Sequence, residues 1–230
     1  MSEIKLYIHF WIVAVREFFK NFPLYKNSFF ILIILGFLSS IPWRALGFGE
    51  GSIPEILVAL TVAILSLVVM VNVILIEKSV ILNRPRERLL YAAPTFLIYT
   101  IYASLIIVAG PFIVFAFTQS IVVAIIPALF SGLAVAMVPV ASVCIDNDNV
   151  NYFKLSWRMF LKKTTLVACV AIISVLTELV VFLLDFISSW QLKLVSSLVY
   201  SFIDAFLIVV LTIVMIKVFY QLKIAIKDPS

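Results

Sequence analysis

Charged side chains are scarce in this chain of 230 residues, where only 13% are Asp, Glu, Lys or Arg and 64% are hydrophobic. A soluble domain usually has roughly 25% charged and about 45–50% apolar residues. So few charges cannot cover a water-facing surface, and the mean hydropathy of +1.22 indicates that lipid surrounds most of the protein. The composition therefore predicts an all-α integral membrane protein.

Groups that serve in metal binding and catalysis are equally few. His9 is the only histidine, which excludes a metal site built from several histidines and a Ser-His pair in the core. Cys144 and Cys169 do not make a disulfide framework, and we interpret both as small buried hydrophobic residues. Glycine-rich phosphate loops and paired-cysteine motifs are absent. We expect no enzyme and no cofactor, unless acids within the membrane act on a lipid.

Long runs without charge divide the chain into hydrophobic segments. No charged residue lies between Glu55 and Glu77, or between Arg88 and Asp146. Because a bilayer core about 30 Å thick requires about 20 apolar residues per helix, the first run fits one span and the second fits two. The same reasoning over the whole chain predicts one membrane domain, 1–230, whose six spans lie near 28–43, 56–76, 94–116, 120–144, 164–186 and 194–217.

The distribution of positive charge predicts the orientation of these spans. Fifteen of the 17 Lys and Arg residues lie in the two terminal segments and in the second and fourth loops, whereas Arg44 and Lys193 lie in the other loops. By the positive-inside rule both termini are cytoplasmic, which requires an even number of spans. Contacts with the bilayer and its anionic headgroups account for the net charge of +5 without a nucleic-acid partner.

Two basic segments have the pattern of helices that lie in the membrane interface. In the first, an apolar stripe at helical spacing (Ile4, Ile8, Trp11, Val15, Phe18, Phe22) lies opposite Lys5, His9, Arg16 and Lys20, and we expect this helix to end near Pro23. In the second, 151–163, basic and aromatic residues alternate in the same way. We expect membrane-surface contacts from Trp11, Arg16, Lys20, Lys154, Trp157 and Arg158.

Small residues and prolines mark the predicted third and fourth spans. A small residue recurs every four positions in the fourth span, which would let a neighbouring helix approach closely: Ala124, Ala128, Gly132 and Ala136. Kinks are expected at Pro127 and Pro139, and at Gly110-Pro111 in the third span. Such kinks either open a cavity or are the ordinary prolines and glycines of membrane helices.

Several segments after Arg84 resemble a known family. They are the leader Arg-Glu-Arg-Leu-Leu-Tyr-Ala-Ala-Pro that ends at Pro94, the helix end 139–146, the segment 153–159 and the tail 219–223. Together they resemble the YciC-like family of six-span bacterial inner-membrane proteins, which looks related to the membrane domain of some glycerophosphodiester phosphodiesterases. The resemblance implies a multi-pass protein of the bacterial inner membrane and supplies no catalytic residue.

Two acids lie within the predicted fifth and sixth spans. Glu178 and Asp204 have similar predicted depths, and with Asp185 and Tyr200 they form a candidate polar patch. An acid at the centre of a membrane helix costs about 2.5–3.5 kcal/mol, so each needs a compensating environment. The acids are protonated hydrogen-bonding groups that fix the helical hairpin, or ligands in a water-filled pocket for a proton or cation, or contacts to a basic residue of a partner.

These features lead to two functional hypotheses. The first is a non-enzymatic inner-membrane protein that supports envelope homeostasis through contacts with lipid or with a membrane protein partner. The alternative is a small transporter or channel subunit that uses Glu178 and Asp204. The two differ in whether these acids hold the fold together or bind a solute.

Overall fold

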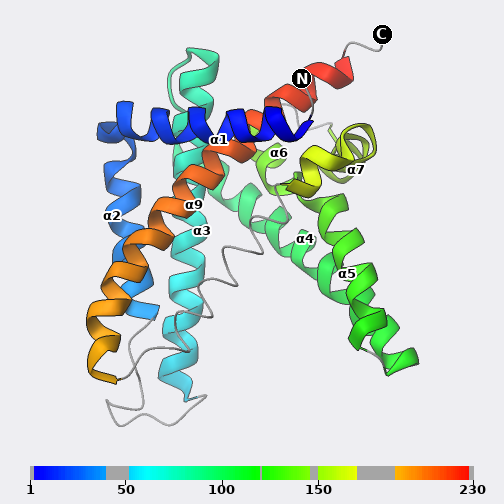
Figure 1. Ribbon diagram of the computed structural model, residues 1–230, viewed down its shortest axis with the longest axis horizontal. Helices are drawn as coiled ribbons and strands as arrows, with labels where there is room; N and C mark the ends of the chain where they lie inside the picture. The colour runs from blue at the N-terminus through cyan, green and yellow to red at the C-terminus, as the bar shows by residue number, and fades with distance from the viewer. Residues whose placement is uncertain (1–2, 40–51, 120, 146–149, 170–189, 228–230) are drawn as a thin grey trace.

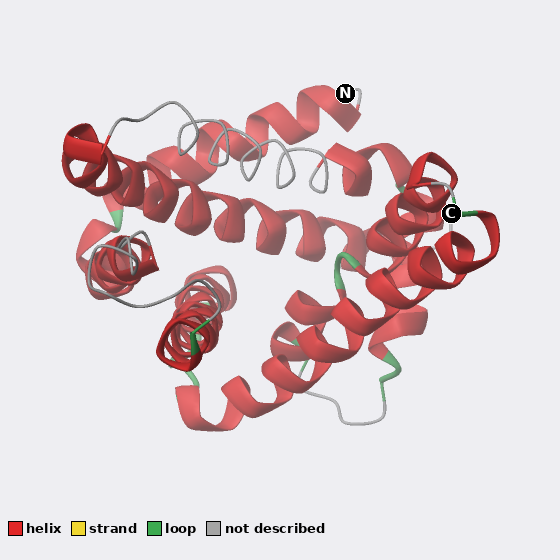
Figure 2. Ribbon diagram, turned by 90° about the horizontal axis from the view of Figure 1, so that it is seen from below, coloured by secondary structure: helices red, strands yellow, loops and turns green. Residues whose placement is uncertain are grey.

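The computed structural model describes residues 3–39, 52–119, 121–145, 150–169 and 190–227. These residues are helical with short turns and contain no strand, so the predicted all-α class is confirmed for them. In Figure 2 the described part of the chain is almost entirely helix, with only short pieces of loop. Among the described residues, four helical segments are long and apolar enough to cross a membrane: Phe22–Ser39, Ile53–Leu82, Leu89–Thr118 and Ser197–Ile224.

The described helices form a bundle, a hairpin and a layer across one end. In the bundle, α2 (Phe22–Ser39), α3 (Ile53–Leu82) and α9 (Trp190–Lys227) pack side by side. α1 (Glu3–Lys20) lies across this bundle at the end where α2 begins (Figure 1). The layer at this end also contains α6 (Val138–Cys144) and α7 (Tyr152–Lys162). α4 (Leu89–Thr118) and α5 (Ile121–Val135) form the hairpin, which diverges from the bundle.

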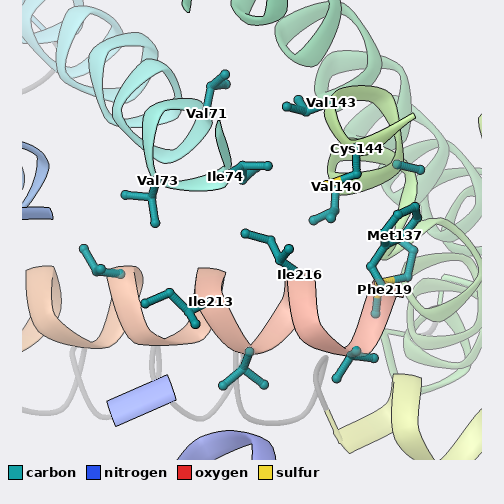
Figure 3. Close-up of a cluster of buried hydrophobic side chains, with 14 of the residues drawn as sticks. Val71, Val73, Ile74, Met137, Val140, Val143, Cys144, Ile213, Ile216 and Phe219 are labelled. Carbon is teal, nitrogen blue, oxygen red and sulfur yellow. The ribbon is translucent and has the colours of Figure 1, made fainter. Parts of the chain in front are cut away.

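The core lies where α3, α6 and α9 meet near the α1 end. Figure 3 shows its aliphatic side chains, among them Val73 and Ile74 of α3, Val140 of α6 and Ile216 of α9. Each of these four is at most 2% exposed, and Cys144 is buried beside them. α4 contrasts with this core, because only 6% of an apolar stretch of 18 residues in this helix is buried. Such an extended apolar surface is typical of a helix in contact with lipid.

Within the predicted fourth span, 120–144, the structure has two helices, α5 and α6, rather than one continuous helix. A turn at Ala136 and Met137 separates α5 from α6. The Ser156 hydroxyl of α7 donates to the Ala134 carbonyl at 2.7 Å and accepts from the Met137 amide at 3.3 Å. Pro139, which has no amide hydrogen, lies in the first turn of α6. The break is therefore stabilised by a side chain that supplies bonds a continuous helix would make.

A close helix contact occurs at Gly36, outside the predicted stripe of small residues (Ala124, Ala128, Gly132 and Ala136). Beyond the neighbouring residues and backbone of its own helix, no described heavy atom lies within 4 Å of a Cβ added at Gly132. A Cβ added at Gly36 of α2 would instead lie 3.1 Å from the Cβ and from the hydroxyl oxygen of Ser201 in α9. Gly36 thus lets α2 and α9 approach where little hydrophobic force draws helices together in lipid.

Candidate functional site

α1 is attached to the bundle by one face. Tyr7, Ala14 and Phe18 are at most 3% exposed, and the Phe18 ring contacts Tyr25 of α2 and Phe206 of α9 at centroid distances of 6.2 and 5.3 Å. Burial raises the pKa of the Tyr7 hydroxyl, which therefore stays neutral. The buried face consists of aromatic and small residues that fit between the ends of the other helices.

A second face of α1 is apolar and exposed. It consists of Ile4, Ile8, Ile12 and Phe19, which are 53–65% exposed. The predicted stripe is therefore divided, because Phe18 is buried against protein, Trp11 is half-buried, and Ile4 and Ile8 face outward. Beside this apolar face lie exposed basic or potentially basic residues: Lys5, His9, Arg16 and Lys20. A helix in the interface needs this adjacency of apolar and basic surface.

The acidic residues of α1 face the protein. Glu3 lies 3.2 Å from the Lys163 ammonium just beyond α7, and Glu17 lies 2.7 Å from the Lys217 ammonium of α9. The first pair is partly exposed, with side-chain exposures of 41% for Lys163 and 28% for Glu3, and contributes little. The second is more buried, so it contributes more to the position of α1.

The Glu17–Lys217 pair belongs to a buried polar cluster of four residues: Glu17, Tyr25, Glu77 and Lys217. Glu77 of α3 is 0% exposed, and its two carboxylate oxygens have different partners. The Tyr25 hydroxyl of α2 donates to Oε2 at 2.6 Å, and the Lys217 ammonium lies 3.1 Å from Oε1. The polar cluster therefore joins α1, α2, α3 and α9, with Tyr25 as the hydrogen-bond donor to the Glu77 carboxyl group and Lys217 as its opposite charge.

The sequence analysis does not predict the polar cluster. Glu77 and Lys217 lie at the ends of predicted spans, 56–76 and 194–217, where charges ordinarily mark the boundary with water. Two opposite charges at the same predicted end of two spans were the available signal. The described residues contain no group of three His, Cys, Asp or Glu side chains able to hold a metal ion.

α7 has the same division of faces as α1. The Asn151 side chain accepts from the Lys154 amide at 2.9 Å and caps the helix, while Ser156, Met159 and Phe160 are buried. On the outer face Lys154 and Arg158 are exposed beside Trp157, which is 37% exposed. The Trp157 ring lies 5.5 Å from that of Phe130 in α5, which fixes an aromatic residue beside two positive charges.

Of the candidate polar patch in the predicted fifth and sixth spans, the structure describes only the two residues on α9, Tyr200 and Asp204. Glu178 and Asp185 lie outside the described residues. Tyr200 and Asp204 lie one turn apart on α9, and both are partly buried. The Ser201 hydroxyl between them donates to the Ser197 carbonyl at 2.7 Å. The contact of Glu178 with Asp204 stays a prediction.

No protein-family model, curated protein or solved structure matches the chain. Membership of the YciC-like family and a place in the bacterial inner membrane therefore stay predictions from the sequence.

Proposed function

We propose that this chain is a non-enzymatic, multi-pass protein of the bacterial inner membrane that supports envelope homeostasis by binding the anionic cytoplasmic surface of the bilayer through α1 and α7. One observation carries the proposal. α1 has one face packed on protein, a neighbouring face of exposed large apolar residues, and basic residues beside it. A helix exposed to water alone would not present Ile4, Ile8, Ile12 and Phe19 together.

The energies of this arrangement favour lipid contact. Moving a half-exposed aliphatic side chain into the acyl boundary gains roughly 1 kcal/mol, half the value for complete burial. Each Lys or Arg near an anionic surface adds about 1 kcal/mol. Because the acids of α1 face Lys163 and Lys217, they do not cancel the basic residues on the lipid-facing side. α7 adds Trp157 with its neighbouring basic residues.

The positions of the chain ends agree with the predicted orientation. Glu3 at the start of α1 and the C-terminal end of α9 lie at the same end of the bundle, where α7 also lies (Figure 1). An even number of crossings would place both ends on one side. The positive-inside rule makes that side the cytoplasm, whose leaflet carries the anionic lipid that α1 requires.

The alternative, a transporter or channel subunit, needs an acid that a solute reaches. Glu77 does not meet this requirement, because it has no exposed surface and its oxygens lie beside Tyr25 and Lys217. Its geometry favours a structural role. The transport hypothesis thus still depends on Glu178 and Asp204, and it is tested through Asp204 below.

The test is the lipid that accompanies the full chain. We expect mass spectrometry of the protein purified in mild detergent to find anionic phospholipid enriched. The variant Arg16→Gln/Lys20→Gln should lose much of this enrichment. The matched control is Arg44→Gln/Lys193→Gln, which removes the same charge from the predicted outer side and should leave the enrichment intact.

Two outcomes would contradict the proposal. Equal loss in both double variants would show that total charge, rather than α1, selects the lipid. A stoichiometric protein that co-purifies with the wild type and is lost in Arg16→Gln/Lys20→Gln, without a change in lipid, would show that α1 binds a protein partner instead.

A further inference from the structure

The polar cluster of Glu17, Tyr25, Glu77 and Lys217 contains more negative than positive groups. The Lys217 ammonium is its one positive group, and it lies 2.7 Å from Glu17 Oε2 and 3.1 Å from Glu77 Oε1. The Tyr25 hydroxyl donates to the other oxygen of Glu77 and adds no charge. When both acids are ionised, the cluster therefore has one negative charge that no group within it balances.

The charged side chains around the cluster do not supply the missing positive charge. The helices α4, α5 and α6 contain no charged residue, and those of α7 are exposed. The positive groups nearest to the cluster along the chain have other surroundings: Arg16, Lys20 and Lys26 are exposed, Lys78 donates to the Val143 carbonyl and to Glu87, and Lys223 lies over the Tyr220 ring. Among the described residues, the ion pairs of Glu17 and Glu77 are the two with Lys217.

The positions of two buried oxygens favour a proton as the balancing charge. Glu17 Oε2 and Glu77 Oε1 are both buried and accept no hydrogen bond from the described residues. They lie within about 6 Å of each other, because neither is farther than 3.1 Å from the Lys217 nitrogen, and two carboxylates at this distance repel. A proton on either acid removes the repulsion. Because such acids titrate together, the proton belongs to the pair rather than to one residue.

We propose that the Glu17–Glu77 pair binds one proton when the surrounding solution becomes more acidic, and that this proton tightens the attachment of α1 to the bundle. The proton enters from the side of α1, where the Glu17 side chain is 26% exposed. The pair lies across the joint between the two parts, because Glu17 belongs to α1 and Glu77 to α3 (Figure 1). Repulsion between the acids opposes this joint, and the proton removes the opposition while Lys217 still holds the remaining carboxylate.

The effect on lipid binding rests on the proposed function, in which α1 is a lipid-binding surface. When α1 is attached firmly, its apolar and basic residues keep one orientation. Less entropy is then lost when this surface binds the bilayer. Anionic lipid should therefore bind more tightly at lower pH.

The sign of the pH dependence follows from the number of protons bound. In the unfolded chain the two acids are hydrated and stay ionised down to about pH 4.3, whereas the folded pair takes up a proton between about pH 8 and pH 6. The folded state is therefore stabilised as the pH falls across this range. One proton changes the folding equilibrium constant by at most about tenfold per pH unit.

Three substitutions separate the pair from other titrating groups. Glu17→Gln leaves one acid beside one ammonium, so the stabilisation at lower pH should disappear, and Glu77→Gln should have the same effect. The matched control is Glu3→Gln, which removes the acid of α1 that pairs with Lys163 outside the cluster and should keep the pH dependence of the wild type. His9 is kept in every variant, so any effect of its charge is common to all of them.

The first measurement is reversible unfolding of the full chain in mixed micelles without anionic lipid, at about pH 8 and about pH 6, with infrared difference spectra between the same two conditions. The wild type and Glu3→Gln should gain up to about a hundredfold in the folding equilibrium constant and show the carbonyl band of a protonated carboxyl group. Glu17→Gln and Glu77→Gln should show neither change. The proton site is overturned if the wild type and Glu17→Gln have equal pH dependence, or if stability follows the concentration of Na⁺ or K⁺ instead of the pH.

The second measurement is the amount of anionic phospholipid that accompanies the full chain at the two pH values. The wild type should retain more at the lower pH, and Glu17→Gln should retain equal amounts. Equal retention by the wild type would refute the regulation of α1. If no anionic lipid is retained at either pH while unfolding still depends on pH, the proposed function is refuted and the proton site is not.

Discussion

Removing the cation of the polar cluster tests whether that cluster holds the bundle together. Lys217→Met keeps the length of the side chain but leaves the fully buried Glu77 carboxylate without the ammonium 3.1 Å away. Breaking a buried pair in this way costs about 3–5 kcal/mol. Because Lys217 is 13% exposed, we expect the lower end, about 3 kcal/mol.

A double variant shows whether the cost comes from the unpaired charge. Glu77→Gln keeps an acceptor for the Tyr25 hydroxyl and leaves Lys217 paired with Glu17, so we expect about 1.5 kcal/mol. In Glu77→Gln/Lys217→Met no charge is stranded at Glu77, and the total should fall at least about 1 kcal/mol below the sum of the single costs. Additive costs, or a Lys217→Met protein as stable as the wild type, would refute the reasoning.

The free energies come from reversible unfolding of the purified protein in mixed micelles, followed by circular dichroism. The same assay tests the helix contact at Gly36, where an added methyl group would lie 3.1 Å from Ser201 Cβ. Gly36→Ala should lower the free energy of unfolding by about 1–3 kcal/mol, whereas Gly132→Ala, with open space around it, should leave it unchanged. Equal effects of the two substitutions would contradict the packing. Ser156→Ala should cost about 1–3 kcal/mol because it removes both bonds at the break between α5 and α6, and an unchanged stability would show that the break does not need them. Asp204→Asn should keep the melting temperature and complement a deletion strain if the acid is a structural hydrogen-bonding group; normal folding with failed complementation would favour the transporter hypothesis.

The helical spans were the most predictable part of the fold. Charge-free runs of sufficient length predicted helices at 28–43, 56–76, 94–116 and 194–217, and the structure places a long apolar helix at each. These lengths follow from the thickness of the bilayer, which acts on every span independently. α3, α4 and α9 extend beyond the predicted limits at both ends, because a helix does not end where the apolar residues end.

The break between α5 and α6 could not be predicted in the same way. Hydropathy is uninterrupted through Ala136 and Met137, and the residue that satisfies the freed backbone groups, Ser156, comes about 20 positions later in the chain. Proline at 139 gave a local hint of a kink. The position of the turn depends on a tertiary contact, which no local pattern contains.

The faces of α1 show what helical periodicity can predict and what it cannot. Helical spacing separates apolar from basic residues correctly, as exposed Lys5 and Arg16 show. It does not distinguish apolar residues that contact protein from those left for lipid, because Phe18 and Ile8 have the same hydrophobic character in the pattern. That difference arises from the aromatic neighbours of Phe18 on α2 and α9.

The ion pairs of α1 and of the polar cluster lie at one end of the molecule, and their position determines how the surfaces of α1 and α7 are held. Between helices in lipid the hydrophobic effect provides little attraction, so polar contacts and close packing determine which helices stay together. The polar cluster fastens α1 to α2, α3 and α9, while Lys78 of α3 binds the Val143 carbonyl of α6 and Ser156 of α7 binds the break at its other side. The surfaces that we propose to contact lipid are thereby attached to the ends of long apolar helices rather than to loops. A surface held in this way keeps its apolar and basic residues in one orientation, which lowers the entropy lost when it binds lipid.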